Sequence, residues 1–274
     1  MGLSNEEISI LAELRKAGHI AGTGAVMEIG AQQLSHRFLE SRKELLELAN
    51  IFGISAPCPL PDPKHTFVVH GRLAHQGADA PMAEQFWRWL GYDYASIDVD
   101  GSPGSIPLDL NYDAVPEHEQ GKYQIVTNCG TTEHVANQFN AFKVIHELTA
   151  LNGVMIHNVP AQGMLNHGLI NYTHKFFWML CRSNGYQLLQ LKLNSDEVPY
   201  ALPENIRETA YDARTGKHLK NYQAVDCLLV AVMKKSFDIP YVAPIDVPTG
   251  THTDNQTLRE RYWTVFTPNA FAGK

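Results

Sequence analysis

Hydrophobic residues form two patterns that alternate along the chain: short continuous apolar runs, and longer segments in which apolar residues recur at helical spacing. The first pattern predicts buried β-strands and the second predicts amphipathic helices. The predicted strands cover residues 24–30, 94–99, 106–110, 124–127, 154–159, 186–193 and 224–233. The predicted helices cover residues 5–17, 34–50, 81–90, 133–149 and 173–184.

This alternation of strands and helices is typical of an α/β fold, in which a mostly parallel sheet carries helices on both faces. We expect residues 1–274 to form a single domain with its core at about 20–235. An insertion is expected at about 54–80, where closely spaced prolines predict a loop. A C-terminal extension is expected at about 236–274.

Composition and charge exclude several classes of partner. The chain has 22 basic and 29 acidic residues and no long basic run, which argues against nucleic-acid binding. It also has no secretion-signal pattern, and no apolar run near the ~20 residues of a membrane helix. Wide spacing of the cysteines predicts free thiols in a cytoplasmic protein; they are Cys58, Cys129, Cys181 and Cys227. The sequence does not determine the oligomeric state and is compatible with a homo-oligomer.

Polar residues gather where the predicted strands end. The first strand closes with Glu28–Gly30, the second with Asp98 and Asp100, and the third with Asp109. The fourth runs into the densest polar cluster of the chain, NCGTTEH at 128–134. Open parallel sheets bind ligands outside the carboxyl ends of their strands. These strand ends therefore predict one small-molecule site.

Four short motifs resemble, in their order and spacing, those of the class I S-adenosylmethionine-dependent methyltransferases. MEIG (27–30) resembles the first motif, SIDVD (96–100) the second, PLDLN (107–111) the third and IVTNCGTTEHV (125–135) the fourth. The resemblance covers about residues 20–195. It implies a doubly wound, mostly parallel, seven-stranded Rossmann-like sheet with an N-terminal helix and loop insertions, and S-adenosylmethionine as the cofactor.

The resemblance also implies roles for single residues. Glu28 is expected to bind the methionyl end of the cofactor or to order the nearby backbone. Asp98, or alternatively Asp100, is expected to bind the ribose hydroxyls, and Asp109 to face the adenine amine. The complete set of implied cofactor-binding residues is Glu28, Gly30, Gln32, Asp98, Val99, Asp109, Leu110, Asn128, Cys129, Gly130 and Glu133.

Two departures from the family pattern change these expectations. The first motif usually contains more glycines, as in ExGxGxG, whereas Ala31-Gln32-Gln33 follows Gly30 here. Gln32 or Gln33 is then the candidate to supply side-chain hydrogen bonds to the cofactor. At the fourth motif an acid is common, whereas this chain has Asn128.

Three histidines lie at or after the fourth motif: His134 near its end, His157 in the predicted strand at 154–159 and His167 in the loop after that strand. An imidazole can accept a proton near neutral pH, so these residues are candidate bases on the acceptor side. A metal site of all three is an alternative, although no HxH or HxxxH spacing supports it and we expect no metal. Structural, hydrogen-bonded histidines are the other alternative.

The expected function is methyl transfer from S-adenosylmethionine to an oxygen or nitrogen of a small-molecule acceptor. One alternative is an NAD-dependent oxidoreductase on a related sheet, although the GxGxxG loop that follows a first strand in such enzymes is absent. A second alternative is a non-catalytic protein that binds the cofactor, which the glycine-poor first motif keeps open.

Overall fold

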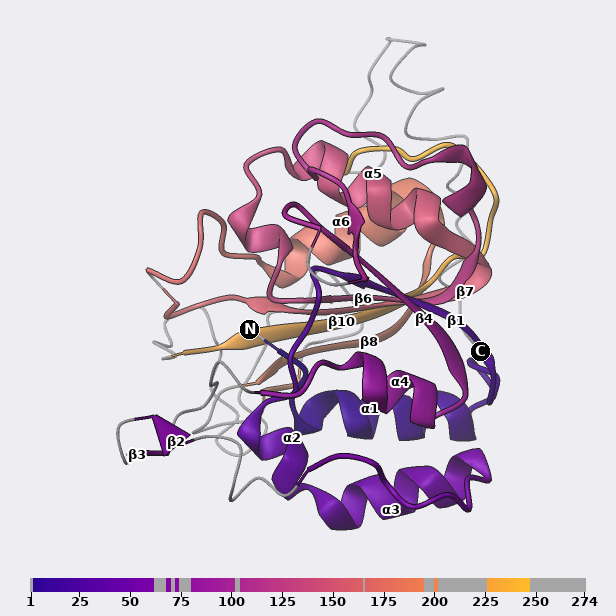
Figure 1. Ribbon diagram of the computed structural model, residues 1–274. Coiled ribbons are helices and arrows are strands. Elements are labelled where there is room, and N and C mark those ends of the chain that lie inside the picture. Colours follow the sequence, from indigo (N-terminus) through magenta and orange to yellow (C-terminus); the bar gives the residue numbers. More distant parts are fainter. Residues whose placement is uncertain are drawn as a thin grey trace, which may run out of the picture.

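The computed structural model describes residues 2–61, 68–69, 72–73, 80–101, 104–164, 166–194, 200–201 and 226–246. These residues form one large sheet between two groups of helices (Figure 1). In spatial order the sheet contains β5 (Ile106–Pro107), β4 (Tyr92–Asp98), β1 (Gly24–Ile29), β6 (Tyr123–Cys129), β7 (Thr149–Pro160), β10 (Leu228–Lys234), β8 (Gln187–Asn194) and β9 (Tyr200–Ala201). A separate pair consists of β2 (Val68–Val69) and β3 (Arg72–Leu73).

The sheet is doubly wound. Neighbouring strands from β5 to β7 are parallel, while β10 runs antiparallel to both β7 and β8. The chain builds β1, β4 and β5 outward on one side and then crosses back to place β6 and β7 on the other side of β1. The strand order therefore reverses between the neighbouring strands β1 and β6. This confirms the predicted mostly parallel sheet, to which the short β9 adds an eighth strand.

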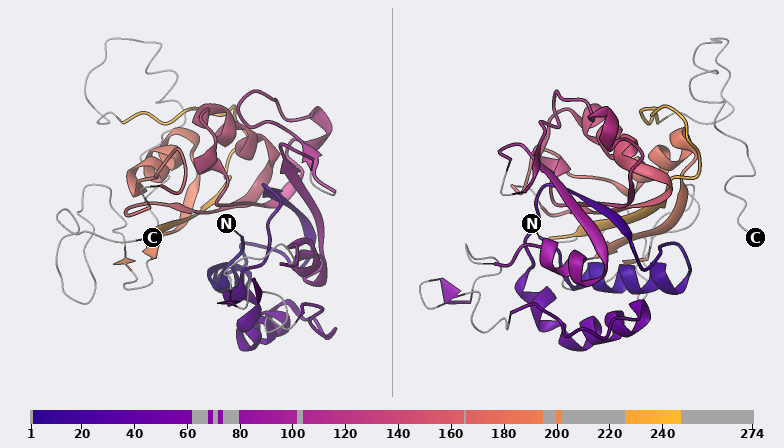
Figure 2. Two further views of the ribbon diagram at one scale, coloured as in Figure 1. Left: turned by 60° about the vertical axis from the view of Figure 1, so that its left-hand side comes forward. Right: turned by 45° about the vertical axis from the view of Figure 1, so that its right-hand side comes forward.

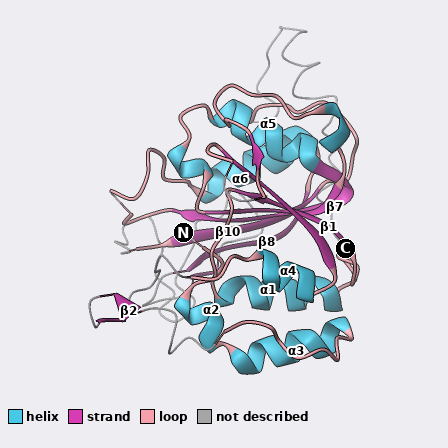
Figure 3. Cartoon of the chain, viewed as in Figure 1, coloured by secondary structure: helices cyan, strands magenta, loops and turns pink. Residues whose placement is uncertain are grey.

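Helices cover both faces of the sheet, as Figure 3 shows in cyan and the views of Figure 2 show from other directions. One face carries α1 (Asn5–Lys16), α2 (His36–Glu40), α3 (Arg42–Phe52) and α4 (Glu84–Trp89). The other face carries α5 (Gln138–Leu148) and α6 (His174–Asn184). The described residues also contain the 3-10 helices η2 (Glu117–Glu119) and η3 (Thr132–His134).

Each face of the sheet has its own hydrophobic core. Along β1, Val26 packs into the core under α1, α3 and α4, whereas Met27 and Ile29 pack into the core under α5 and α6. A strand that is covered on both faces needs apolar residues at nearly every position. This explains why continuous apolar runs predicted the central strands.

Two predicted helices differ from the structure. The helix predicted at 34–50 is broken at Ser41, whose hydroxyl donates a hydrogen bond to the Arg37 carbonyl at 2.8 Å. Serine side chains compete in this way with helical backbone bonds. The helix predicted at 133–149 begins only at Gln138, because the Asn137 side chain caps it by accepting from the Asn140 amide.

Other predictions have mixed outcomes. None of the four cysteines forms a disulfide bond, as expected. Residues 54–61 contain no helix or strand, in line with the predicted loop. Most of the predicted insertion at 54–80, and the predicted extension beyond residue 246, lie outside the described residues. Among the helices that the structure describes, none is both long and apolar enough to cross a membrane.

Candidate cofactor site

A cavity of about 400 Å³ lies where the loops after β1, β4, β5 and β6 meet. This is the point of strand reversal, where open α/β sheets bind their ligands. The volume falls in the range of small-molecule sites, about 300–1,000 Å³. The lining residues are Gly30, Ala31, Gln32, Ile97, Asp98, Val99, Leu108, Asp109, Leu110, Asn111, Gly130, Thr131, His134 and Val135.

Many of the residues singled out from the sequence line this cavity. They are Gly30, Gln32, Asp98, Val99, Asp109, Leu110, Gly130 and His134. Thr131 and Asn111 also line the cavity; both lie within the quoted motifs, but neither was singled out as a site residue from the sequence. Thr131 belongs to the polar cluster after β6, and its hydroxyl donates to the Ile29 carbonyl. Adjacency to Gly130 was the signal that would have found it.

Gly30 allows the loops after β1 and β6 to approach each other closely. Its φ is +77°, and a Cβ added there would lie 2.5 Å from Thr131 Oγ1. A side chain at this position is therefore disfavoured both by the left-handed backbone and by the neighbouring loop. The close approach forms one wall of the cavity.

Comparison of Gly30→Ala with Gly53→Ala should separate the cost of the left-handed backbone from the cost of the clash with the neighbouring loop. Gly53 has a similar φ of +74°, but an added Cβ there meets nothing within 4 Å. We expect Gly53→Ala to lower the free energy of unfolding by about 1–2 kcal/mol. Gly30→Ala should lower it by about 1 kcal/mol more, because Thr131 must turn away from the Ile29 carbonyl. Urea unfolding measures both, and equal losses would contradict the close contact.

The Gln32 side chain forms hydrogen bonds to both the loop after β1 and the loop after β6, and its Oε1 atom has no partner among the described residues. Its Nε2 donates to the carbonyls of Ile29 and Gly30 and to Thr131 Oγ1, at 3.0–3.3 Å. The side chain is buried, and Oε1 has no hydrogen-bond partner among the described residues. Buried polar atoms are normally paired. This oxygen has almost no accessible surface and is therefore not open to the cavity.

The carboxylates of Asp98 and Asp109 are both fixed by backbone amides at the cavity. Asp98 accepts from the Ala31 amide at 3.1 Å and from the Val99 amide at 2.8 Å. Asp109 accepts from the Asn111 amide at 2.8 Å. Each carboxylate keeps lone pairs for further donors. Asp100, the alternative to Asp98, lies on an exposed turn outside the cavity lining.

Glu28 lies beneath the cavity, fully buried, and does not line it. Its carboxyl group accepts from Trp87 Nε1 at 2.7 Å, from the Tyr94 hydroxyl at 2.8 Å and from the Gln32 amide at 3.0 Å. Burial raises the pKa of Glu28 to about 7. This geometry corresponds to the expectation that Glu28 orders nearby backbone, since it holds the loop after β1 through Gln32.

Asn128 and His157 form a pair behind the cavity. Asn128 Oδ1 accepts from the Thr132 amide at 3.2 Å, so its Nδ2 faces His157 Nδ1 at 3.1 Å and donates to it. His157 therefore carries its proton on Nε2. The ring is fully buried against Phe142 and Phe177, and burial lowers its pKa to about 3. Neither residue lines the cavity, and the pair supports η3 from below.

Cys129 also points away from the cavity. Its thiol lies 3.8 Å from Glu7 Oε1 on the α1 side of the sheet, and burial raises the pKa of the thiol. The Cys129 thiol therefore does not face the cavity. Only the backbone of this residue belongs to the polar cluster predicted at the end of β6.

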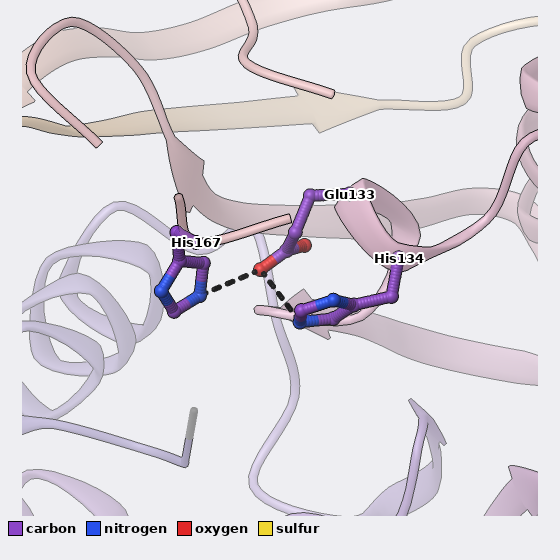
Figure 4. A group of neighbouring side chains, drawn as sticks. All are labelled: Glu133, His134 and His167. Carbon is purple, nitrogen blue, oxygen red and sulfur yellow. Dashed lines mark ion pairs between the residues drawn. The ribbon is translucent and has the colours of Figure 1, made fainter. Parts of the chain in front are cut away.

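Glu133, His134 and His167 converge at one side of the site (Figure 4). Glu133 Oε1 lies 3.8 Å from His134 Nε2 and 3.4 Å from His167 Nε2. Burial raises the pKa of Glu133 and lowers the pKa values of both imidazoles. His134, half-exposed, lines the cavity. The structure therefore brings together two of the three predicted histidines, with Glu133 in place of His157.

The strand order, with its reversal between β1 and β6, and the cavity at that reversal complete the arrangement that the four motifs predicted. The chain has a doubly wound, Rossmann-like fold with a mostly parallel sheet and helices on both faces. In this fold, the residues that follow β1, β4, β5 and β6 all line the same cavity.

Comparisons with known proteins give only distant similarity. No protein-family model and no curated protein sequence matches the chain. Among solved structures, it is similar to Burkholderia thailandensis 1,6-didemethyltoxoflavin-N1-methyltransferase, with 9% identity and a TM-score of 0.39 over 84% of this chain and 78% of that one. It is also similar to an S-adenosylmethionine-dependent methyltransferase from Archaeoglobus fulgidus, with 11% identity and a TM-score of 0.38 over 82% and 93%.

Proposed function

We propose that this protein binds S-adenosylmethionine and transfers its methyl group to a small-molecule acceptor. The observation that carries the proposal is the cavity at the strand reversal, which Gly30, Gln32, Asp98 and Asp109 line together. When bound, S-adenosylmethionine supplies a methyl carbon that its sulfonium centre has activated toward a nucleophile.

The lining residues fit the chemical groups of this cofactor. Asp98 is suited to accept hydrogen bonds from the ribose hydroxyls, as acids at this position of related sheets do. Gln32 is suited to hold the cavity wall beside the methionine portion, because its Nε2 joins the Gly30 carbonyl to Thr131 Oγ1. Val99 and Leu110 offer apolar contact to the adenine ring, and Asp109 offers an acceptor for its amine.

The acceptor is proposed to bind on the side of His134, which lines the cavity and contacts Glu133. His167 lies beside the same carboxylate. Alignment of donor and acceptor contributes most in such a reaction, up to roughly 7–11 kcal/mol in the best intramolecular models. His157 is proposed to act by positioning, since it holds Asn128 and, through it, the loop that carries His134.

Calorimetric titration tests the cofactor. We expect S-adenosylhomocysteine to bind with a Kd in the micromolar range and NADH to give no heat of binding. Binding of NADH without binding of S-adenosylhomocysteine would overturn the proposal in favour of an oxidoreductase. Formation of S-adenosylhomocysteine in the presence of small hydroxyl or amine acceptors then distinguishes an enzyme from a protein that only binds the cofactor.

A further inference from the structure

We propose that Glu133, His134 and His167 bind a divalent transition-metal ion at the edge of the cavity, and that this ion binds an oxygen atom of the acceptor. The first part stands on the geometry of the three residues alone. The second part rests on the proposed function and deepens it, because it makes the acceptor an oxygen nucleophile.

Buried polar atoms that form no hydrogen bond are the main reason to place a cation here. The Glu133 side chain is 0% exposed, and neither of its carboxylate oxygens has a hydrogen-bond partner among the described residues. The same holds for His167 Nε2, which faces Glu133 Oε1. A buried carboxylate is costly unless it is paired or coordinates a metal. Figure 4 shows both imidazole rings directed toward the one carboxylate oxygen.

The spacing of the three side chains suits a metal ion. Their ligand atoms all lie within 4.8 Å of one another, with 3.4 and 3.8 Å between the carboxylate oxygen and the two imidazole nitrogens. Ligand atoms about 2.0–2.2 Å from a tetrahedral ion are roughly 3.4 Å apart. Small rotations of the half-exposed His134 therefore suffice to close the site. Two histidines and one carboxylate are also the ligand set of catalytic zinc centres.

The backbone holds the two halves of this site together. The amides of Leu169 and Ile170 donate to the Glu133 carbonyl at 2.8 and 3.1 Å, which fixes the loop after β7 on η3. Gly168, next to His167, lies so close that an added Cβ would meet Glu133 Cγ at 2.8 Å. This close approach brings the His167 ring to the carboxylate, so that the ligand set is formed in advance.

Position gives the ion a role toward the acceptor. Three protein ligands leave at least one coordination position open, as in catalytic rather than structural zinc sites. Because His134 also lines the cavity, an oxygen acceptor in the cavity lies at the edge of the metal site. Coordination of a hydroxyl to the ion lowers the pKa of that hydroxyl, and its proton leaves to solvent. The two histidines then act through the ion and not as free bases.

Zinc titration of the purified, tag-free full-length protein tests the site without any cofactor. We expect one equivalent of Zn²⁺ to bind with a Kd below about 10 µM. Glu133→Gln and His134→Gln should each weaken binding by at least tenfold, on the order of what altered metal-site residues cost. His134 is half-exposed, so its variant is expected to fold even if Glu133→Gln does not.

A matched control is His118→Gln. His118 also lies beside a glutamate, with 3.4 Å between His118 Nε2 and Glu119 Oε1, but the His118 side chain is more exposed than that of His134. It should bind Zn²⁺ as the wild type does. A wild-type Kd above about 100 µM, or an equal loss in the control, would overturn the metal site. Zinc binding without S-adenosylhomocysteine binding would leave the metal site standing and defeat the proposed function.

The acceptor part is tested with Co²⁺ in place of Zn²⁺ and with acetohydroxamate as the oxygen ligand. We expect the visible absorption spectrum of the bound cobalt to change on addition of acetohydroxamate, because an open coordination position becomes occupied. An unchanged spectrum would mean a closed, structural site and would overturn the role of the ion toward the acceptor.

Discussion

Replacement of Glu28 by alanine should lower the free energy of unfolding by about 3–5 kcal/mol. The change removes the shared acceptor of three donors: Trp87 Nε1, the Tyr94 hydroxyl and the Gln32 amide. Each buried donor that loses its partner costs about 1–3 kcal/mol, and water that enters the new space recovers part of the sum. Chemical denaturation at pH 7 measures the loss.

The same substitution should also weaken binding of S-adenosylhomocysteine, although Glu28 does not line the cavity. Its bond to the Gln32 amide holds the loop that presents Gly30 and Gln32 to the ligand. A variant that loses less than about 1 kcal/mol of stability and binds as the wild type does would show that this loop is held by other contacts.

Glu28→Gln is the matched variant, because it keeps the size of the side chain and removes its titration. Burial raises the pKa of Glu28 to about 7, above the usual value of 4.5. The stability that the protonated group contributes is therefore fully present below pH 4.5 and is lost as the pH rises through 7. The stability of Glu28→Gln relative to the wild type should rise by up to about 3 kcal/mol over this range. A difference that does not change with pH would contradict the raised pKa.

The sequence contained enough information to predict the sheet and the location of the cavity. Central strands such as β1 and β6 are buried on both faces, so their residues are apolar almost throughout and bounded by turn residues. The carboxyl end of each strand is then a local feature of the chain. Gly30, Asp98 and Asp109 lie at such ends, and for this reason they were found.

Side-chain direction was harder to predict because it depends on contacts distant in sequence. Cys129 turns toward Glu7 of the N-terminal helix, and His157 turns toward Phe177 of α6. Neither partner is visible from the motif that contains the residue. The meeting of Glu133 with His167 likewise requires the close packing of Gly168, which only the folded loop reveals.

Replacement of Asp98 by alanine should weaken binding of S-adenosylhomocysteine by about 150-fold or more. A charged acceptor contributes about 1.5–3 kcal/mol per hydrogen bond, and the two ribose hydroxyls are its proposed donors. The substitution also releases the Ala31 amide, which Asp98 holds in the loop after β1. Calorimetry gives the affinity, and thermal unfolding of the unliganded variant shows whether the fold is retained.

Asp100→Ala is the control that decides between the two acids of the second motif. Asp100 stands two residues further along, on an exposed turn outside the cavity lining, so its loss should change the affinity by less than about twofold. The comparison is independent of overall charge, because each variant removes one carboxylate from the same segment. A larger effect at Asp100 than at Asp98 would mean that the ligand approaches over the turn, and the cavity would then not be where the ribose binds.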